Sequence, residues 1–286
     1  MPNPCNDLGQ LGSLLGLSSS DRIQDGAVNA VSSADRSGSL FVCVDLEAFE
    51  FDHTKILEVG VATLDSRDLR DLTTDDLVTT WLSKIKSEHY IVQERQHLVN
   101  KRYVKGCPEG FIFGQSKIIP VVKAQALLRQ HLSDPRSLLS SDETVGDAEA
   151  PSVYIVAHGL KNDTTLMKNF GIANVYNLGL TGDIDTQRIC SGKKKPAGLK
   201  KLLDAIDIPY EHLHNGGNDC TYTLQALVKM IHMHHYERED LEKRLELLRH
   251  PPEEPKKKKQ RRGPKGEGER SVTNVMRPTI TNENAV

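Results

Sequence analysis

The stretch Leu40–Glu50, LFVCVDLEAFE, decides how the rest of this sequence is interpreted. Its first residues are apolar and favour β-structure, which is the pattern of a strand buried on both faces. Asp45 and Glu47 interrupt this run, and because side chains two apart on a strand point the same way, both carboxylates leave the sheet together. Two unpaired like charges are costly in a core, so the pair favours a bound divalent cation. Two solvated acids on a strand that has reached water are the alternative.

Length and composition describe a chain with one sizeable folded domain and appendages. The sequence has 286 residues and a net charge of −2, which averages an acidic body with a very basic tail. No apolar run is long enough to span a bilayer, and the first residues lack the pattern of a secretory signal. The five cysteines are odd in number and have no CxxC spacing, which favours a reducing compartment. We therefore expect an intracellular protein, nuclear or cytoplasmic, without a membrane partner.

Three regions differ in composition. Residues 1–38 are rich in Ser, Asp, Asn and Gly, so we expect a disordered arm with at most a short helical turn near Leu11–Leu17. Residues 39–250 carry the periodic pattern of a folded domain. Residues 251–286 are poor in apolar side chains and open with PPEEPKKKKQRRGPK, which predicts a disordered basic tail.

The periodic region predicts alternating strands and helices. A second strand over Lys55–Leu64 should run antiparallel to the first, because the connection between them is short. A polar, ordered insertion follows over 86–116. The other predicted elements are a strand at Val78–Ile85, a helix at Val121–Leu132, a strand at Val153–Ala157, a helix at Thr164–Phe170, a strand at Asp183–Thr186, and helices at Gly198–Ile206 and Asp219–His250. Alternation alone is compatible with many α/β folds, but this order is that of a ribonuclease H-like mixed sheet with flanking helices.

Two further segments carry acids that this order would bring to the first pair. HGLKND, after the strand at 153–157, puts Asp163 at the start of a helix, and YEHLHNGGND puts Asp219 at the start of the last one. His214 stands five residues before Asp219, across a Gly-Gly pair that lets the loop fold back. We expect these three residues to meet Asp45 and Glu47 at one edge of the sheet. Taken singly, each Asp has the alternative of a helix-capping residue.

These motifs resemble a known superfamily. An Asp-x-Glu on the first strand, an Asp after a later strand and His-x4-Asp near the end are similar to the DEDDh 3′→5′ exonucleases, from about Leu40 to His235. The segments DLEAFE, LEVGVATLDSRDL, HLVNKRYVKGCPEGFIFG and LHNGGNDCTYTLQAL resemble the fungal Gfd2-like C-terminal domain family. That family is named for a factor linked to a DEAD-box helicase of messenger RNA export.

The resemblance implies a metal-dependent nuclease. Two Mg²⁺ or Mn²⁺ ions would be held by four carboxylates: Asp45, Glu47, Asp163 and Asp219. Asp45 would bridge both ions, and Glu47 and Asp219 would complete one of them. Asp163 would bind mainly through water, and His214 would be the general base for the attacking water. The implied reaction is 3′→5′ exonuclease hydrolysis of RNA or single-stranded DNA.

Some neighbours of these residues depart from the superfamily pattern. Ala48 and Phe49 follow the first acidic pair, where members often have Thr and Gly that seat the terminal nucleotide. Gly159 and Asn162 stand where the second motif often has Asn and Phe. The predicted metal ligands are therefore complete, whereas the nucleotide-seating residues are not the usual ones. Efficient turnover, and the choice between RNA and DNA, stay open.

Two alternatives to an active exonuclease follow. One is a nucleic-acid-binding adaptor of the same fold, with little or no turnover, in messenger RNA export or RNA metabolism. The other is a nuclease that is idle until a protein partner completes its substrate groove, with residues 89–114 as the docking surface.

Other charged and histidine clusters have simpler interpretations. We expect the histidines of the last helix, His232, His234 and His235, on a solvated face. Asp183 and Asp185 should lie at a strand edge and turn, and a role beside the acidic site is the alternative.

Two basic runs have open roles. Lys193–Lys195 either meets a phosphate backbone or forms a solvated loop. Lys256–Arg262 either binds phosphates without reading sequence, serves as a nuclear localisation signal, or keeps the tail soluble.

Overall fold

The computed structural model describes residues 3–17, 38–70, 72, 77–133, 151–191 and 196–250. The strands are β1 (Asn3–Pro4), β2 (Ser39–Phe49), β3 (Asp52–Asp65), β4 (Lys86–Val92), β5 (Lys117–Ile119), β6 (Ser152–Ala157) and β7 (Gly182–Asp185). The helices are α1 (Leu8–Leu14), α2 (Val78–Leu82), α3 (Val121–Ser133), α4 (Leu160–Asn169), α5 (Thr186–Cys190), α6 (Leu199–Ala205), α7 (Gly216–Tyr236) and α8 (Arg238–Arg249). The predictions for 18–37, Lys193–Lys195 and 251–286 concern residues outside this set. None of the described helices combines the length and apolar character that crossing a membrane requires.

The strands of the described chain form one mixed sheet in the order β1-β7-β6-β2-β3-β4-β5. β2, β3 and β4 pair antiparallel, and the predicted strand at Lys55–Leu64 lies within β3. β6 pairs parallel with the other side of β2, and β7 follows β6 in the same direction. β5 joins β4 in parallel at the far edge. This arrangement confirms the ribonuclease H-like mixed sheet that the order of elements predicted.

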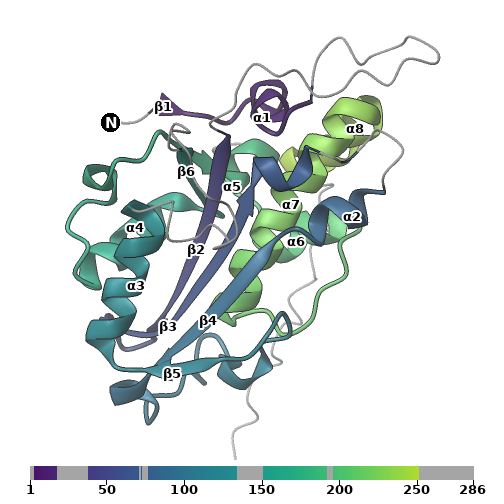
Figure 1. The fold of residues 1–286 in the computed structure, drawn as a ribbon. Coiled ribbons are helices and arrows are strands. Elements are labelled where there is room, and N and C mark those ends of the chain that lie inside the picture. Colours follow the sequence, from purple (N-terminus) through teal and green to yellow (C-terminus); the bar gives the residue numbers. More distant parts are fainter. Residues whose placement is uncertain are drawn as a thin grey trace, which may run out of the picture. The chain divides into compact units, whose positions relative to one another are not determined.

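Helices cover both faces of the sheet, so β2 is buried on both sides. Leu40 and Val42 belong to a core shared with α3 and α4, whereas Phe41 and Cys43 belong to a core shared with α1, α6, α7 and α8. Figure 1 shows α3 and α4 on one side of β2 to β4 and α7 on the other. Because strand side chains alternate, residues 45 and 47 continue the series that faces α7.

Residues 3–17 are folded, which corrects the prediction of a disordered arm over 1–38. β1 pairs parallel with β7, and the side chain of Asn6 accepts a hydrogen bond from the Asp185 N–H at 2.9 Å. β7 is therefore an internal strand. The prediction that Asp183 lies at a strand edge is wrong, because β1 pairs beside it. Its carboxylate accepts a hydrogen bond from the Tyr176 hydroxyl at 3.1 Å.

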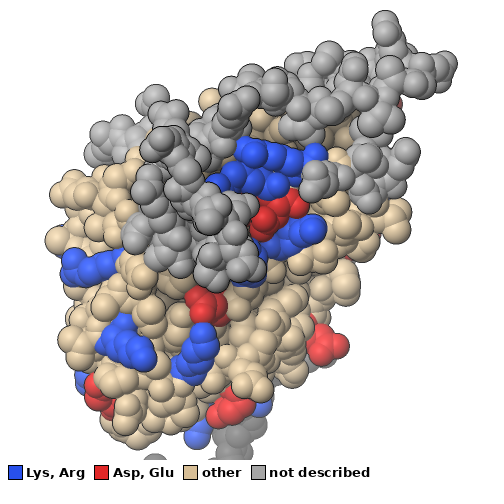
Figure 2. All heavy atoms as spheres, viewed as in Figure 1, with Lys and Arg blue, Asp and Glu red and all other residues tan. Residues whose placement is uncertain are grey.

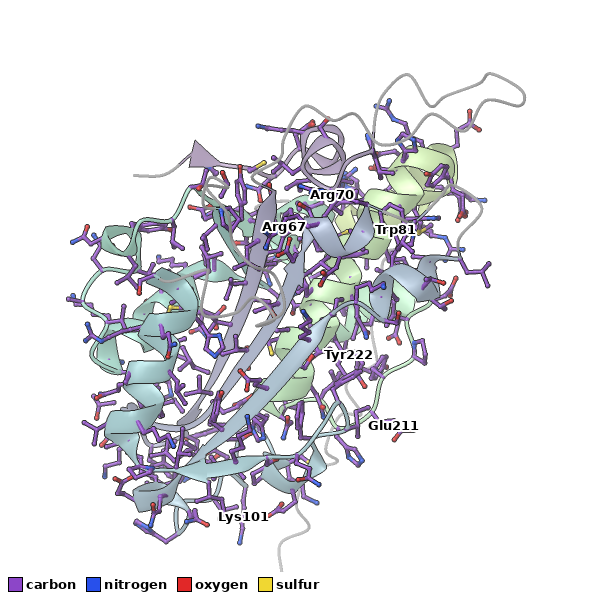
Figure 3. The ribbon with its side chains drawn as sticks, in the orientation of Figure 1. Arg67, Arg70, Trp81, Lys101, Glu211 and Tyr222 are labelled. Carbon is purple, nitrogen blue, oxygen red and sulfur yellow. The ribbon has the colours of Figure 1, made fainter. Side chains whose placement is uncertain are left out.

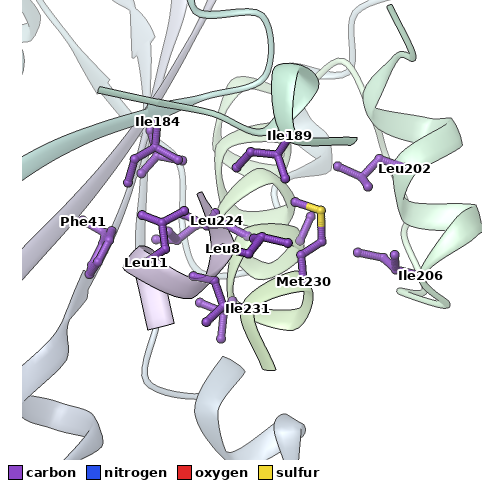
Figure 4. Packing of buried hydrophobic residues seen from close by; sticks show 14 of the residues in the cluster. Leu8, Leu11, Phe41, Ile184, Ile189, Leu202, Ile206, Leu224, Met230 and Ile231 are labelled. Carbon is purple, nitrogen blue, oxygen red and sulfur yellow. The ribbon is translucent and has the colours of Figure 1, made fainter. Parts of the chain in front are cut away.

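Helix α1 forms because it docks on α7. Leu8, Leu11 and Leu15 are buried, and Figure 4 shows Leu8 and Leu11 packed beside Ile231 of α7. A helix of this length is not stable alone in water, so local periodicity gives only a weak signal. The apolar stripe becomes a helix once α7 offers a surface to cover it.

The third of the antiparallel strands β2, β3 and β4 is β4 at Lys86–Val92, and the predicted strand at Val78–Ile85 contains helix α2 instead. The β-branched residues 78–80 favour a strand by propensity alone. Trp81 is only 3% exposed and its ring lies edge-on to His232 of α7, with centroids 5.8 Å apart. Burial of this one large side chain against α7 outweighs the local preference.

The predicted helix over Asp219–His250 is two helices. Glu237, between α7 and α8, has φ −135° and ψ 40°, which redirects the chain. The bend buries Leu241 and Leu245 completely, in the core that α6 and α7 share. A straight continuation would not bring both leucines back to this core, so tertiary packing sets the break.

We expect Leu11→Ala to lower the free energy of unfolding by about 2–5 kcal/mol, because it opens a cavity in a closed core. Gln10→Ala changes the adjacent exposed position of α1 and should cost less than about 0.5 kcal/mol. Urea denaturation of both variants measures the difference. Equal unfolding midpoints would show that α1 is not part of the folded unit.

Candidate active site

Asp45 and Glu47 lie where β2 ends its regular pairing. Asp45 is opposite Gly60 and Glu47 is opposite Glu58 in the antiparallel register with β3. A register shift follows at Ala48, a kind of irregularity that often adjoins functional sites. Both acids keep part of their surface exposed, so they sit at the border between the core and solvent.

The first turn of α7 lies directly against the backbone of β3. A Cβ at Gly60 would lie 1.9 Å from the carbonyl oxygen of Gly216, a distance that excludes any side chain. Asn215 caps the helix by accepting a hydrogen bond from the Asn218 N–H at 3.0 Å. The helix thus begins before Asp219, which lies in its first turn and is brought to the acidic end of β2.

His214 and Asp219 approach Glu47 from this helix and its preceding loop. His214 has φ 67°, and its backbone N–H donates to Oδ2 of Asp219 at 3.0 Å. One potential ligand atom from each of these three residues lies within 4.8 Å of the others. Asp45 and Asp163 are not part of this closest group.

Asp163 reaches the site from the first turn of α4, which Asp185 holds in place. Asp163 is buried, with 4% of its surface exposed. Asp185 caps α4 by accepting the N–H groups of Gly159 at 2.9 Å and Leu160 at 3.2 Å. Gly159 has φ 91°, a conformation that glycine adopts without strain. The predicted strand-end acid Asp185 therefore serves as the support for Asp163.

Burial, followed by repulsion from nearby carboxylates, raises the pKa of all four carboxyl groups. Burial moves the pKa of Asp45 well above its usual range, and the charges of Asp163 and Glu47 raise it further. Burial, followed by the charge of Glu58, raises the pKa of Glu47 to about 8. Burial also raises the pKa of Asp163 to about 8 and that of Asp219 to about 7. The common cause is negative charge that is removed from water and lacks sufficient positive charge nearby.

A fifth acid, Glu58, lies beside this site with a histidine partner, and neither residue was among those predicted from the sequence. Glu58 is 4% exposed, and its Oε2 lies 2.9 Å from Nε2 of His89, which is fully buried. The other ring nitrogen of His89 lies 2.8 Å from the Ser116 hydroxyl. Oε2 of Glu58 also accepts the Gly216 N–H at 3.4 Å, so the pair connects β3, β4 and α7. The available signal was a lone acid inside the apolar run KILEVGVATL, because a buried charge requires a partner.

The donor set fits a divalent cation with a preference for oxygen ligands. Oδ1 of Asp219 is buried and has no hydrogen-bond partner among the described residues, whereas Oδ2 accepts the His214 N–H. An unsatisfied carboxylate oxygen among other acids is a ready ligand for Mg²⁺ or Mn²⁺. Asp45, Glu47, Asp163 and Asp219 are the residues that would hold such ions.

The three histidines of α7 were predicted to lie on a solvated face, and this prediction is wrong. Each of them is half-buried. The ring of His232 also meets Tyr236, with centroids 4.6 Å apart, and burial lowers the pKa of His232. α7 is covered by α1 and α2, so few of its side chains remain fully exposed.

The sheet and a family comparison together assign this protein the fold of the DEDDh-type exonucleases. Residues 40–230 match the family model described as DNA polymerase III subunit epsilon-like, C-terminal domain. The chain therefore belongs to this DEDDh family.

Relatives in two yeasts agree with the fungal resemblance. Over 206 residues the chain is 27% identical to Uncharacterized protein YDR514C of Saccharomyces cerevisiae, covering 65% of this chain and 40% of the relative. Over 203 residues it is 27% identical to Uncharacterized nucleolar protein C2C4.08 of Schizosaccharomyces pombe, covering 66% of this chain and 68% of the relative. Good for full DBP5 activity protein 2 of S. cerevisiae is 26% identical over 210 residues, 65% of this chain and 34% of that protein. The match thus spans less than half of both S. cerevisiae relatives.

Among solved structures, the chain is similar to exonuclease I. A product-bound structure of exonuclease I has a TM-score of 0.42 at 10% identity, covering 72% of this chain and 45% of that chain. Exonuclease I of E. coli in complex with a dA16 oligonucleotide has a TM-score of 0.39 at 12% identity, covering 72% of this chain and 42% of that chain.

In a chelator, we expect stability to fall as pH rises from about 5 to about 8. The pKa values of Glu47 and Asp163 are about 8 in the folded state, against about 4 in an unfolded chain. The folded state therefore holds more protons in this window, and the free energy of unfolding decreases with pH. Excess Mn²⁺ at pH 8 should restore about 2.7 kcal/mol at a hundredfold excess over its Kd. Calorimetry would contradict this if the melting temperature followed neither pH nor Mn²⁺.

Gly60→Ala should cost about 1–3 kcal/mol and weaken Mn²⁺ binding, because the new methyl group pushes the start of α7 away from β3. Gly12→Ala is the matched control, since a Cβ there meets only Ile231 and Leu17 side chains, at 3.8 Å. That control should keep or gain stability, as Ala favours a helix over Gly. Denaturation midpoints and Mn²⁺ titration calorimetry compare the two variants. Indistinguishable results would remove the close contact from the explanation of the site.

Proposed function

We propose that this chain is a metal-dependent 3′→5′ exonuclease that hydrolyses phosphodiester bonds of RNA or single-stranded DNA. Asp45, Glu47, Asp163 and Asp219 would hold two Mg²⁺ or Mn²⁺ ions, and His214 would act as general base. The observation that carries the proposal is the group formed by Glu47 of β2, Asp219 of α7 and His214, whose potential ligand atoms lie within 4.8 Å of one another, with one oxygen of Asp219 left unsatisfied. Structural acids would instead be paired with cations or hydrogen-bond donors.

The residues of the chain divide the work of hydrolysis. Divalent ions bound to the acids would supply an acidified water and neutralise charge on the phosphodiester. His214 takes a proton from the water as its oxygen attacks phosphorus and the bond from phosphorus to the 3′-oxygen breaks. The leaving 3′-oxygen gains a proton from solvent, and a nucleoside 5′-monophosphate is released. His214 is exposed, so it can return its proton to bulk water.

Glu58 and His89 stabilise this site through buried contacts among β3, β4 and α7. Their buried hydrogen bond fixes the carboxyl group of Glu58 next to Glu47, and this carboxyl group accepts the N–H of the first residue of α7. This support favours a strongly acidic site, which suits binding of cations.

A nucleic-acid-binding adaptor of the same fold is the second candidate. Gly159 offers no side chain to seat a nucleotide, and its N–H is already used by Asp185. Ala48 likewise carries no polar group toward the acidic site. The adaptor proposal keeps the metal and the nucleic acid but expects little turnover. A protein partner at 89–114 stays a prediction.

We also infer that the protein works inside the nucleus. One relative is named as a nucleolar protein, and Lys256–Arg262 is a basic run of the kind that serves as a nuclear localisation signal.

Asp45→Asn and His214→Ala should fail in different ways on end-labelled RNA and DNA oligonucleotides. Asp45→Asn removes a ligand, so Mn²⁺ affinity and shortening from the 3′ end should be lost together. His214→Ala should keep Mn²⁺ binding, lose about 10²–10⁴-fold in rate and lose the acidic limb of the pH–rate profile.

Asp240→Asn changes an exposed position of α8 and is the control. It should retain the full rate. A His214→Ala protein as fast as the parent chain from pH 6 to 8 would remove His214 as the base. If the parent chain binds oligonucleotides but never shortens them, the adaptor becomes the better description.

A further inference from the structure

Residues 98–106, LVNKRYVKG, form a loop that is attached to the end of β2. The carboxylate of Glu50 accepts hydrogen bonds from three successive backbone N–H groups, those of Lys101, Arg102 and Tyr103, at 2.9–3.1 Å. The N–H of Tyr103, with those of its neighbours, holds the pKa of Glu50 below its usual value, so the acceptor stays charged. An irregular segment bound in this way presents its side chains in a set orientation.

Asn100 attaches the 98–106 loop to β2 a second time. Its side chain accepts the Glu50 N–H at 2.9 Å and donates to the Ala48 carbonyl at 2.8 Å. Asn100 is 9% exposed, so little water competes for these bonds. The loop is thereby fixed to the residues that directly follow Glu47.

The outer surface of this region consists of exposed aromatic rings. Phe51 is 59% exposed and Tyr103 is 68% exposed, with their ring centroids 6.1 Å apart. Phe49 lies edge-on to Phe51 at 5.4 Å. Four of the nine exposed large hydrophobic side chains of the described chain gather here: Phe51, Val99, Tyr103 and Val104. A patch of this kind on a soluble domain marks a binding surface.

Basic side chains accompany the rings. Lys101, Arg102 and Lys105 are exposed, the loop contains no acid, and the Arg102 guanidinium lies 5.5 Å from the centre of the Tyr103 ring. On the described face drawn in Figure 2, Lys and Arg side chains lie among Asp and Glu. In Figure 3, Lys101 lies at the opposite end of the molecule from Arg67. The 98–106 loop thus joins positive charge to aromatic rings, a combination suited to phosphates and bases.

A hollow of about 540 Å³ connects this surface to the acidic site. Its lining includes Glu47 and His214 of the acidic site together with Tyr103 of the 98–106 loop. Ala48 and Asn162, which stand where the superfamily often has nucleotide-seating residues, line the same hollow. A polymer whose end reaches Glu47 therefore has Tyr103 beside it.

We propose that Phe51, Arg102 and Tyr103 form a stacking platform that binds unpaired bases of single-stranded nucleic acid beside the acidic site. This inference rests on the proposed function, because the polymer it seats is the substrate of that reaction. Aromatic rings stack on every base, so such binding is tolerant of sequence. Bases inside a duplex already stack on one another and present no free face. The platform therefore selects single strands over duplexes.

Binding of labelled RNA and DNA 12-mers to the full chain in a chelator tests the platform without cleavage. We expect Tyr103→Ala to raise the Kd for single strands by about 5- to 150-fold, the loss of one stacked base. Tyr103→Phe keeps the ring and should bind like the parent chain. An oligonucleotide without bases at its last two 3′ positions should bind the parent chain weakly, and Tyr103→Ala should weaken it no further.

Leu247→Ala is the matched control, since Leu247 is 60% exposed on α8, outside the hollow. It should leave the Kd unchanged. All of these variants change exposed side chains, so each should have the melting temperature of the parent chain. Equal Kd values for Tyr103→Ala and the parent chain overturn the platform and assign the exposed rings to a protein partner. A loss with Tyr103→Phe as large as with Tyr103→Ala also overturns it, because the hydroxyl would then be the contact.

Failure of the platform and failure of the proposed function give different results. If the parent chain binds single strands through Tyr103 but no oligonucleotide shortens with Mn²⁺, the platform stands and the nuclease does not. If oligonucleotides shorten and Tyr103→Ala binds them like the parent chain, the nuclease stands and the platform does not.

Discussion

Direct contact between the backbone of β3 and the first turn of α7 governs the acidic site. Gly60 leaves no room for a side chain between strand and helix, and a Cβ at Gly216 would lie only 3.2 Å from the Gly60 nitrogen, so the helix starts at the end of the acidic strand. This brings Asp219 and the preceding His214 within reach of Glu47. The same contact places Gly216 over the buried Glu58, which ties the helix start to β4 through His89. Glu47 and Glu58 already face each other within the sheet, whereas His214 and Asp219 reach them only through this close approach.

Concentrating acids in this way opposes folding unless positive charge arrives. The pKa values of Asp45, Glu47, Asp163 and Asp219 are all raised, first by burial and then by neighbouring carboxylates. A protein that keeps such a cluster gives up stability in the absence of a ligand. The unsatisfied oxygen of Asp219 shows where the compensation is missing. Repulsion among the acids is thus the physical basis for cation affinity at this place.

Beyond the acids, the site owes its shape to hydrogen bonds between irregular segments and regular ones. Asp185 holds the turn before α4, and Glu50 holds the 98–106 loop at the end of β2. Both use a carboxyl group to accept hydrogen bonds from backbone N–H groups that have no partner in a helix or strand. The hollow next to Glu47 is therefore bordered on two sides by segments whose position is set.

The sequence by itself determined the strands β2 and β3, the order of helices and strands along the second half of the domain and the places of the acids in the chain, because these depend on local periodicity and on residue type. Spacing of two along β2 was enough to place Asp45 and Glu47 on one face. Tertiary structure alone decided that residues 3–17 fold, that Trp81 lies in a helix and that the last helix breaks at Glu237, since each choice buries side chains against α7 or α6. It also decided the Glu58–His89 pair and the 98–106 loop, which join residues distant in sequence. No local pattern encodes such contacts, because their free energy exists only after the sheet and α7 have come together.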